Sequence, residues 1–130
     1  MSYYMAKTSS QPFEAVVAEV IERLRAEGFG VLTDIDVQAT LKAKIGAQVP
    51  RYRILGACNP HLAHEALQME NKLGVLLPCN VIVRETAEGS VEVASVDPVA
   101  AMERTGNARL AATADEVRQR LSRALSAVAA

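Results

Sequence analysis

The sequence has 130 residues, half of them hydrophobic, so we expect residues 1–130 to fold as a single domain with its own core. Its 14 basic and 15 acidic side chains nearly cancel and form no long run of one sign. This balance argues against nucleic acid or an anionic membrane as a partner, because basic surfaces recognise both.

The sequence also indicates a soluble, cytoplasmic protein. Its first residues include neither a basic leader nor an apolar stretch ahead of a cleavage site. Charged residues interrupt every hydrophobic stretch before it reaches the roughly 20 residues that a membrane span needs. In the cytoplasm we expect Cys58 and Cys79 to stay as thiols.

The first part of the chain predicts a strand followed by a helix. Residues 2–8 predict a short strand, and Ser9, Ser10 and Pro12 are typical of a helix start. The buried stripe of that helix recurs at three- and four-residue spacing: Phe13, Val16, Val17, Val20, Ile21 and Leu24. Gly28 is placed to end the helix in a left-handed conformation.

From residue 29 the pattern changes to a period of two, which predicts a second strand. We expect one side of this strand to carry every second residue: Phe29, Val31, Thr33, Ile35 and Val37. Asp36 is suited to cap a short helix that Gly46 ends. A further strand over residues 52–57 leads directly into Cys58.

The second half predicts a helix over residues 60–71 and then a β-hairpin. Residues 74–77 are predicted to be extended, and Pro78 interrupts the strand there because it cannot donate a ladder hydrogen bond. Alternating apolar residues on both sides of the 86–90 turn predict an antiparallel pair.

The C-terminal part contains two more helix starts. Asp97 and Pro98 begin a short helical turn, and Thr113 with Glu116 forms a capping box for the last helix. The long amphipathic helices near both ends need the same kind of apolar surface. The sequence therefore predicts an α+β fold, a largely antiparallel sheet of four to five strands with helices packed mainly on one face.

The two cysteines have the most specific local surroundings in the chain. Cys58 lies between a predicted strand and the helix that Asn59 and Pro60 start. The free amides and the positive dipole end of that helix lower a thiol pKa, which makes Cys58 the candidate nucleophile. Cys79 follows a strand-breaking proline, and we predict that Cys58, Asn59, Cys79 and Asn80 bind a ligand.

A metal site is another interpretation of the same region. His61 and His64 are three residues apart on the predicted helix, so their imidazoles lie on neighbouring rows of one face. With Cys58 and Cys79 they provide two sulfurs and two nitrogens, a set that suits zinc or another soft metal. Their spacing matches no recognised zinc module, and two solvated surface histidines are the plainer alternative.

Simpler roles stay open for these residues. A disulfide between the cysteines would contribute on the order of 3 kcal/mol, although a reducing cytosol opposes it. A free cysteine also packs well as a small buried hydrophobe. Asp34 and Asp36 alternate on a strand, which is more typical of a solvated face than of a catalytic pair. The chain has no phosphate-binding loop and no nucleophile-elbow motif.

Four segments carry a resemblance to a known family: Gly28-Phe29-Gly30-Val31-Leu32-Thr33, Asp36-Val37, Ile54-Leu55-Gly56-Ala57-Cys58-Asn59-Pro60 and Leu76-Leu77-Pro78-Cys79-Asn80-Val81-Ile82-Val83. With these segments, and with Asp97-Pro98 and the last helix, nearly the whole chain resembles the domain of unknown function 302 family. The resemblance implies a small bacterial or archaeal α/β domain that forms a homodimer and has no established activity. It includes both cysteines and does not extend to the two histidines.

Three functions from different classes are consistent with these observations. The first is a non-enzymatic domain that binds a small ligand or a soft metal at the Cys58/Cys79 site, beside the helix N-terminus. The second is thiol-based redox or transfer chemistry, with Cys58 as nucleophile and Cys79 in support. The third is structural, with packed cysteines and a homodimer surface as the purpose of the domain.

Overall fold

The computed structural model describes residues 2–130, which form five strands, five α-helices and two short 3₁₀ helices. In chain order these are β1 (Tyr4–Ser9), α1 (Phe13–Ala26), β2 (Gly30–Asp36), α2 (Val37–Ile45), β3 (Tyr52–Cys58), α3 (Pro60–Met69), η1 (Leu73–Leu76), β4 (Cys79–Glu85), β5 (Val91–Val96), α4 (Pro98–Glu103), η2 (Ala108–Leu110) and α5 (Ala111–Ala127).

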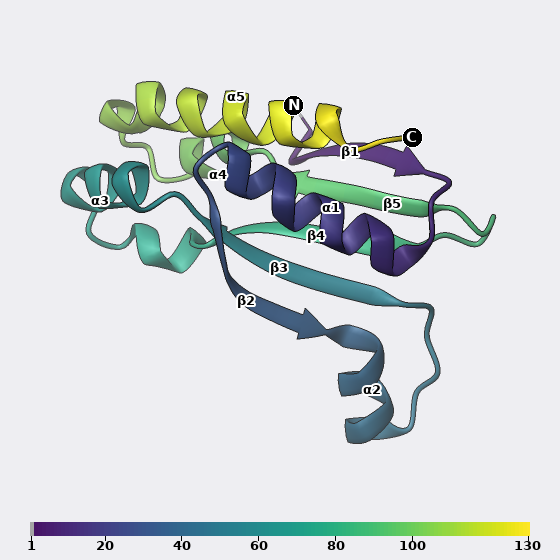
Figure 1. Cartoon of the computed structure of the whole chain (residues 1–130). Helices are drawn as coiled ribbons and strands as arrows, with labels where there is room; N and C mark the ends of the chain where they lie inside the picture. Colours follow the sequence, from purple (N-terminus) through teal and green to yellow (C-terminus); the bar gives the residue numbers. More distant parts are fainter. Residues whose placement is uncertain (1) are drawn as a thin grey trace.

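All five strands belong to one antiparallel sheet with the order β1-β5-β4-β3-β2. Figure 1 shows α1 and α5 over the same face of this sheet, and the two helices contact each other. Both α3 and α4 also contact α5, so the helical layer gathers around the last helix. The predicted α+β fold, with helices mainly on one face of an antiparallel sheet, is confirmed.

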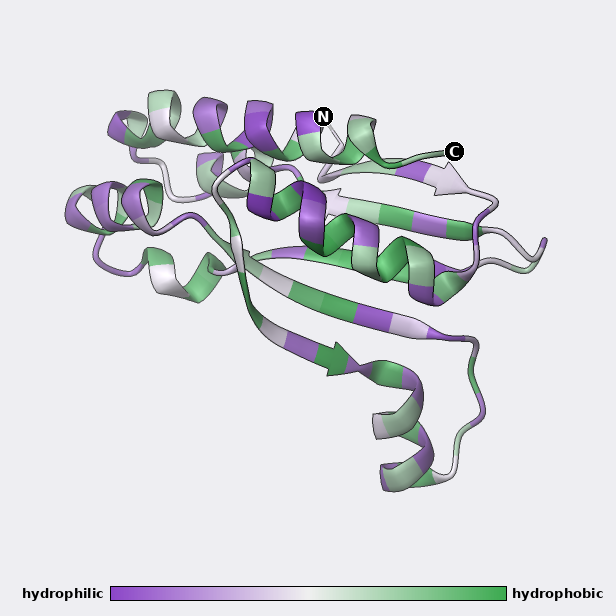
Figure 2. Ribbon diagram, viewed as in Figure 1, coloured by the Kyte–Doolittle hydropathy of each residue, from purple (hydrophilic) through white to green (hydrophobic). Residues whose placement is uncertain are grey.

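The core lies between the sheet and the layer formed by α1 and α5. In the central strands, Leu55, Val81, Val83 and Val93 have no exposed surface, and neither does Leu24 of α1. Figure 2 shows hydrophilic residues on the outer side of α5 and hydrophobic residues toward the sheet. Burial of each such aliphatic side chain contributes about 1.5–3 kcal/mol, so this interface holds the helices on the sheet.

The first helix has the buried stripe that the sequence predicts. Five residues of α1 are buried: Phe13, Val16, Val17, Val20 and Leu24. Gly28 follows the helix with a φ of +88°, the left-handed conformation expected of a glycine there. The start differs from the prediction, because Pro12 precedes the helix and Ser9 Oγ accepts a hydrogen bond from Gln11 N instead of capping it.

Two short helices begin where their capping residues predict. Asp36 caps α2 by accepting a hydrogen bond from the amide three residues later, at 2.9 Å, and Gly46 ends that helix with a φ of +67°. Asn59 caps α3 in the same way at 3.2 Å, with Pro60 at the first helical position. Local sequence is therefore enough to fix these ends.

Two predictions for the second half are wrong. The capping box is not formed, because α5 begins at Ala111 as a continuation of η2, and Thr113 Oγ1 instead donates to Glu65 at 3.2 Å. Residues 74–77 are not extended, since most of them lie in the 3₁₀ turn η1. A tight turn is needed there because α3 and β4 are joined by few residues and β4 begins only after Pro78.

A bulge in β2 overturns the predicted side-chain alternation of that strand. Val31 pairs with Ala57, whereas Thr33 pairs with Gly56, so the register shifts at Leu32. An extra residue in one strand reverses the faces of the residues that follow it. Val31 therefore faces the helices, and Thr33 faces the other side.

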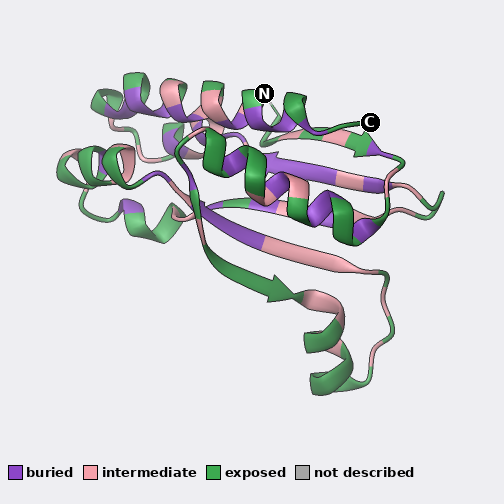
Figure 3. Ribbon diagram, in the orientation of Figure 1, coloured by how far each residue is buried: buried purple, intermediate pink, exposed green. Residues whose placement is uncertain are grey.

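The segment from β2 to α2, residues 30–46, forms an arm at the edge of the sheet, in which β2 pairs with β3 and α2 projects beyond the strands (Figure 3). Six of the seven residues of β2 are exposed, and every residue of α2 keeps part of its surface open to solvent. Leu32 is 68 % exposed and Ile45 is 75 % exposed. The arm thus places apolar side chains outside the core of its own chain.

Candidate functional site

A narrow cavity lies where β3 and β4 meet the start of α3. Both cysteines and Asn59 line it, and most of the other lining residues are apolar: Phe29, Ala57, Leu62, Ala63, Ala66, Leu77, Pro78, Met102, Thr113 and Val117. The cavity has a volume of about 30 Å³. This is close to the share of one water molecule in the liquid, so no organic ligand fits in this conformation.

Burial makes Cys79 a poor nucleophile. The side chain is 7 % exposed at the start of β4. Burial raises the pKa of its thiol to about 11, and the charge on Cys58 adds a smaller contribution. The thiol is therefore protonated at neutral pH, whereas nucleophilic attack and metal binding both need the thiolate.

Cys58 and Cys79 share this cavity, but they are not a close pair, which corrects the predicted cysteine pair. Both thiols are free. Cys79 is the register partner of Ala57, and Cys58 follows one residue later at the end of β3, where it reaches the cavity from beside the start of α3. Cys58 is half-buried and pairs with Gly30 on the other neighbouring strand.

The N-terminus of α3 has little capacity left to bind an anion. Asn59 Oδ1 already accepts a hydrogen bond from Leu62 N at 3.2 Å, and Asn59 O accepts one from Ala63 N at 2.9 Å. Pro60 has no N–H, so His61 N is the remaining amide of the first turn. Asn59 therefore acts chiefly as a helix cap.

The two histidines lie on the solvent side of α3. His61 and His64 are exposed, and His64 Nε2 is 3.2 Å from Gln68 Nε2. The residues between them line the cavity instead. Among residues 2–130, no three His, Cys, Asp or Glu side chains are grouped as metal ligands would be, so the predicted four-residue set with Cys58 and Cys79 is not assembled. Binding of zinc or another soft metal stays a prediction.

The side of the sheet away from α1 and α5, which we call the helix-free face, carries a continuous apolar row, and α2 borders it only beside Tyr52 and Arg84. Register partners on all five strands form this middle row: Ala6, Ala94, Ile82, Ile54 and Ile35. The next row toward the β4–β5 turn is more polar: Thr8, Glu92, Arg84 and Tyr52. Outward positions of an antiparallel sheet with one wet face are normally polar, so the middle row departs from that pattern.

A hollow of about 660 Å³ lies on the helix-free face. All three tyrosines of the chain line it, Tyr3 and Tyr4 at the β1 edge and Tyr52 on β3. The rings of Tyr3 and Tyr4 meet edge to face, with centroids 5.0 Å apart. Asn80, one of the predicted ligand residues, lines this hollow and not the cysteine cavity.

The charges that line the hollow cancel. Arg84 and Glu92 are cross-strand partners, and Arg84 Nε donates to Glu92 Oε1 at 2.7 Å. Among the described residues, neither the terminal nitrogens of Arg84 nor Glu92 Oε2 has a further partner. The hollow therefore has no net charge, and it keeps one donor group and one acceptor group free.

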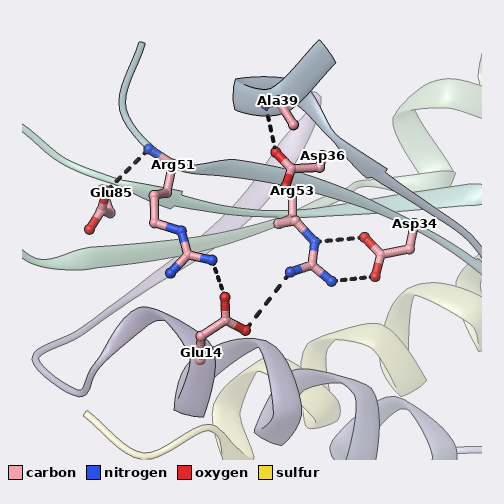
Figure 4. A network of polar contacts seen from close by, with 7 residues as sticks. All are labelled: Glu14, Asp34, Asp36, Ala39, Arg51, Arg53 and Glu85. Atoms are coloured by element: carbon pink, nitrogen blue, oxygen red, sulfur yellow. Dashed lines mark hydrogen bonds and ion pairs between the residues drawn. The ribbon is translucent and has the colours of Figure 1, made fainter. Parts of the chain in front are cut away.

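On the helix-covered side, a network of ion pairs ties β2 to β3 and to α1 (Figure 4). Arg53 Nε donates to Asp34 Oδ1 at 2.7 Å, and a second bond joins the same side chains. Glu14 of α1 pairs with Arg51 and also approaches Arg53 at 3.9 Å. The hydrogen bonds from Arg53 hold the pKa of Asp34 below its usual value. Asp34 thus anchors the arm while Asp36 caps a helix, so the two carboxylates have separate structural partners.

Sequence reasoning did not identify the hollow. Its residues come from β1, β3, β4 and β5, and a single sequence does not give the strand order that brings them together. One signal was available, since Ile54 and Ile82 occupy positions that should face water if the strands alternate strictly.

These features define a class of protein, a small α+β domain whose five-stranded antiparallel sheet is covered by helices on one face. The sequence profile of the domain of unknown function DUF302 matches residues 5–128, and the chain belongs to this family. The fold is similar to the crystal structure of an uncharacterized conserved DUF302 protein from Bacillus stearothermophilus, with a TM-score of 0.93 and 24 % sequence identity over 98 % of this chain and 99 % of that chain. No curated protein matches the chain.

Within residues 2–130, no helix is both long enough and apolar enough to cross a membrane.

Proposed function

We propose that this domain is a non-enzymatic binding module that works as a homodimer, joined through its helix-free face. The observation that carries this proposal is the middle row, in which every strand of the sheet contributes an aliphatic side chain on the side without a helical layer. Ala6 and Ile35 are exposed, Ile54 and Ile82 are half-buried, and Ala94 is buried. Single exposed apolar residues are ordinary, whereas apolar side chains in an unbroken row across a sheet are typical of an interaction site. The family resemblance implies the same oligomeric state.

Function at the cysteines has less support. The cavity that they line has a volume of about 30 Å³, and the pKa of Cys79 is raised to about 11. Both properties favour a packing role for Cys79 over ligand binding or catalysis. Redox or transfer chemistry with Cys58 as nucleophile therefore stays a prediction, as does the cytoplasmic location.

Sedimentation equilibrium over a wide concentration range tests the homodimer. Ile35 lies in the middle row and is 47 % exposed, so Ile35→Glu should weaken association by about 30-fold or more. Val75 is 85 % exposed in η1, away from this face, and Val75→Glu is the matched control. A wild-type chain that stays monomeric at every concentration would contradict the proposal.

A small molecule in the hollow is the second candidate function. Its volume of about 660 Å³ falls in the range of roughly 300–1,000 Å³ that ligand pockets occupy. Three tyrosines, an asparagine and a charge-balanced ion pair line it, which suits an uncharged aromatic ligand. Such a ligand would compete with a second copy for the same face.

The tyrosine rings provide the test of this second candidate. All three lie at the hollow and the chain has no tryptophan, so their NMR signals report on this face. Addition of benzamide should shift the signals of Tyr4 or Tyr52 and leave those of the buried Phe13 and Phe29 in place. If only the phenylalanine signals move, the ligand is not in the hollow.

A further inference from the structure

The order of the strands suggests how the two copies meet, given the homodimer proposed above. We infer that a second copy docks with its twofold axis along β4, so that the two sheets stack face to face with β4 over the partner's β4. Because β4 is the middle strand, this axis places β1 over the partner's β2 and β5 over the partner's β3. The strands of both copies stay aligned, as in stacked sheets about 10 Å apart.

The middle row is complementary to itself about this axis. Ala6 lies opposite the partner's Ile35, Ala94 lies opposite the partner's Ile54, and Ile82 meets its own copy. Small side chains thus face large ones, which fills the interface without overlap. An axis across the strands would instead place alanine on alanine at two strands and isoleucine on isoleucine at three, where the axis along β4 has only the one contact of Ile82 with its copy, so the two sheets would be held apart at one edge and leave a void at the other.

The ion pair on the next row is also balanced by this arrangement. Arg84 lies on β4 at the axis, opposite the partner's Arg84, and Glu92 lies one strand away on β5. The twofold places the partner's Glu92 at the same offset on the other side of Arg84. Each guanidinium then reaches both carboxylates, so the free donors of Arg84 and the free Glu92 Oε2 find partners, and the four charges cancel.

The area of this face reaches what a specific interface needs. Five strands spaced by about 4.8 Å, with six residues of about 3.4 Å each, give a flat footprint of about 500 Å² per copy. Two copies together bury about 1,000 Å², the lower bound for a specific interface, before the relief of the side chains is counted. Only α2 adds to this area, because β2 is already counted among the five strands, and the axis brings the partner's β1 to the edge of the sheet where the 75 % exposed Ile45 of α2 projects.

Distance measurement between spin labels tests the axis. Glu88 is exposed in the turn between β4 and β5, so a label on Glu88→Cys leaves the interface intact. The background is Cys58→Ser, because Cys58 is half-buried, whereas Cys79 is buried and resists labelling. With the axis along β4, both turns lie at the same end, and the labels should be about 20 Å apart. An axis across the strands would separate them by more than about 35 Å.

Exchange of side-chain size provides a second test that depends on individual contacts. Ala94→Ile and Ile54→Ala should each weaken the dimer by about tenfold, and the double variant should recover most of that loss. The control is Ala94→Ile with Ile82→Ala, because these two residues are neighbours within one chain and do not face each other between copies. This control should not recover the dimer.

The outcomes separate the two proposals. A monomer in sedimentation equilibrium overturns the homodimer and the axis together. A dimer with label distances above about 35 Å, or with recovery only in the control pair, overturns the axis and leaves the homodimer standing.

Discussion

Cys79 should be alkylated far more slowly than an ordinary thiol. Its pKa is raised to about 11 by burial. At pH 8 a thiol with this pKa is about 0.1 % ionised, against roughly a quarter for an unperturbed cysteine with a pKa of about 8.5. Ionisation alone therefore predicts a rate roughly 200-fold lower, and the limited access to a buried sulfur lowers it further.

The assay is alkylation with iodoacetamide as a function of pH in the Cys58→Ser chain, in which Cys79 is the remaining thiol. In the folded protein the rate should rise about tenfold per pH unit and level off only near pH 11. In urea the same plateau should appear near pH 8.5, as for any exposed cysteine. A plateau between pH 8 and 9 in the folded chain would refute the packing role and restore the case for a reactive thiol.

The same pKa difference should make the fold less stable in alkali. Well below pH 8 the thiol is protonated in both the folded and the unfolded chain, so it adds no pH dependence. As the pH rises through the unfolded pKa of about 8.5 toward the folded pKa of about 11, the thiol ionises in the unfolded chain and stays protonated in the folded one, and the free energy of unfolding should fall by up to about 3 kcal/mol. Urea denaturation of Cys79→Ala should show no such decrease. Lysines and tyrosines titrate in both proteins, so the difference between their free energies of unfolding isolates the effect of Cys79.

Three further substitutions test contacts elsewhere in the fold. Gly56→Ala should lower the free energy of unfolding in urea by about 2 kcal/mol, because a Cβ there would overlap Thr33 Oγ1 and lie 2.7 Å from Pro78 Cγ. Removal of the Thr33 hydroxyl should recover only part of this lost stability, since the contact with Pro78 stays. Asp97→Ala should cost about 2 kcal/mol and lower the melting temperature, since this 5 % exposed carboxylate caps α4 and pairs with an arginine of α5. Asp34→Asn should cost no more than about 0.5 kcal/mol at pH 7 because the ion pair is partly exposed. That cost should shrink as the pH falls below about 4, because the pKa of Asp34 is lowered only in the folded chain.

Much of the fold could be predicted because its signals are local. The caps at Asp36 and Asn59 and the left-handed glycines Gly28 and Gly46 depend on a few neighbouring residues, and all four are where the sequence places them. The stripe of α1 is equally local. These signals, together with the hairpin formed by β4 and β5, determine the fold class before any long-range contact is known.

The candidate sites could not be predicted as well, because they depend on register. One extra residue at Leu32 moves Thr33 to the helix-free face, and no composition rule marks such a bulge. Strand alternation likewise separates Cys79 from Asn80, so the predicted ligand set divides between the narrow cavity and the hollow. Packing accounts for Cys79, because a buried thiol is also a small apolar group.

The composition of the central strands adds an argument for a partner. In an antiparallel sheet with one face in water, each strand alternates apolar residues toward the core with polar residues toward the water. Strands that are apolar on both faces are typical of sheets that are covered on both faces. Val81-Ile82-Val83 on β4 and Ile54-Leu55 on β3 are apolar on both sides, although the helices of the chain cover only one. The strands therefore have the sequence of a sheet with a second layer, which within residues 2–130 the chain does not supply. In the proposed homodimer a second copy supplies that layer, and the alanines at one end of the middle row leave room for the isoleucines at the other.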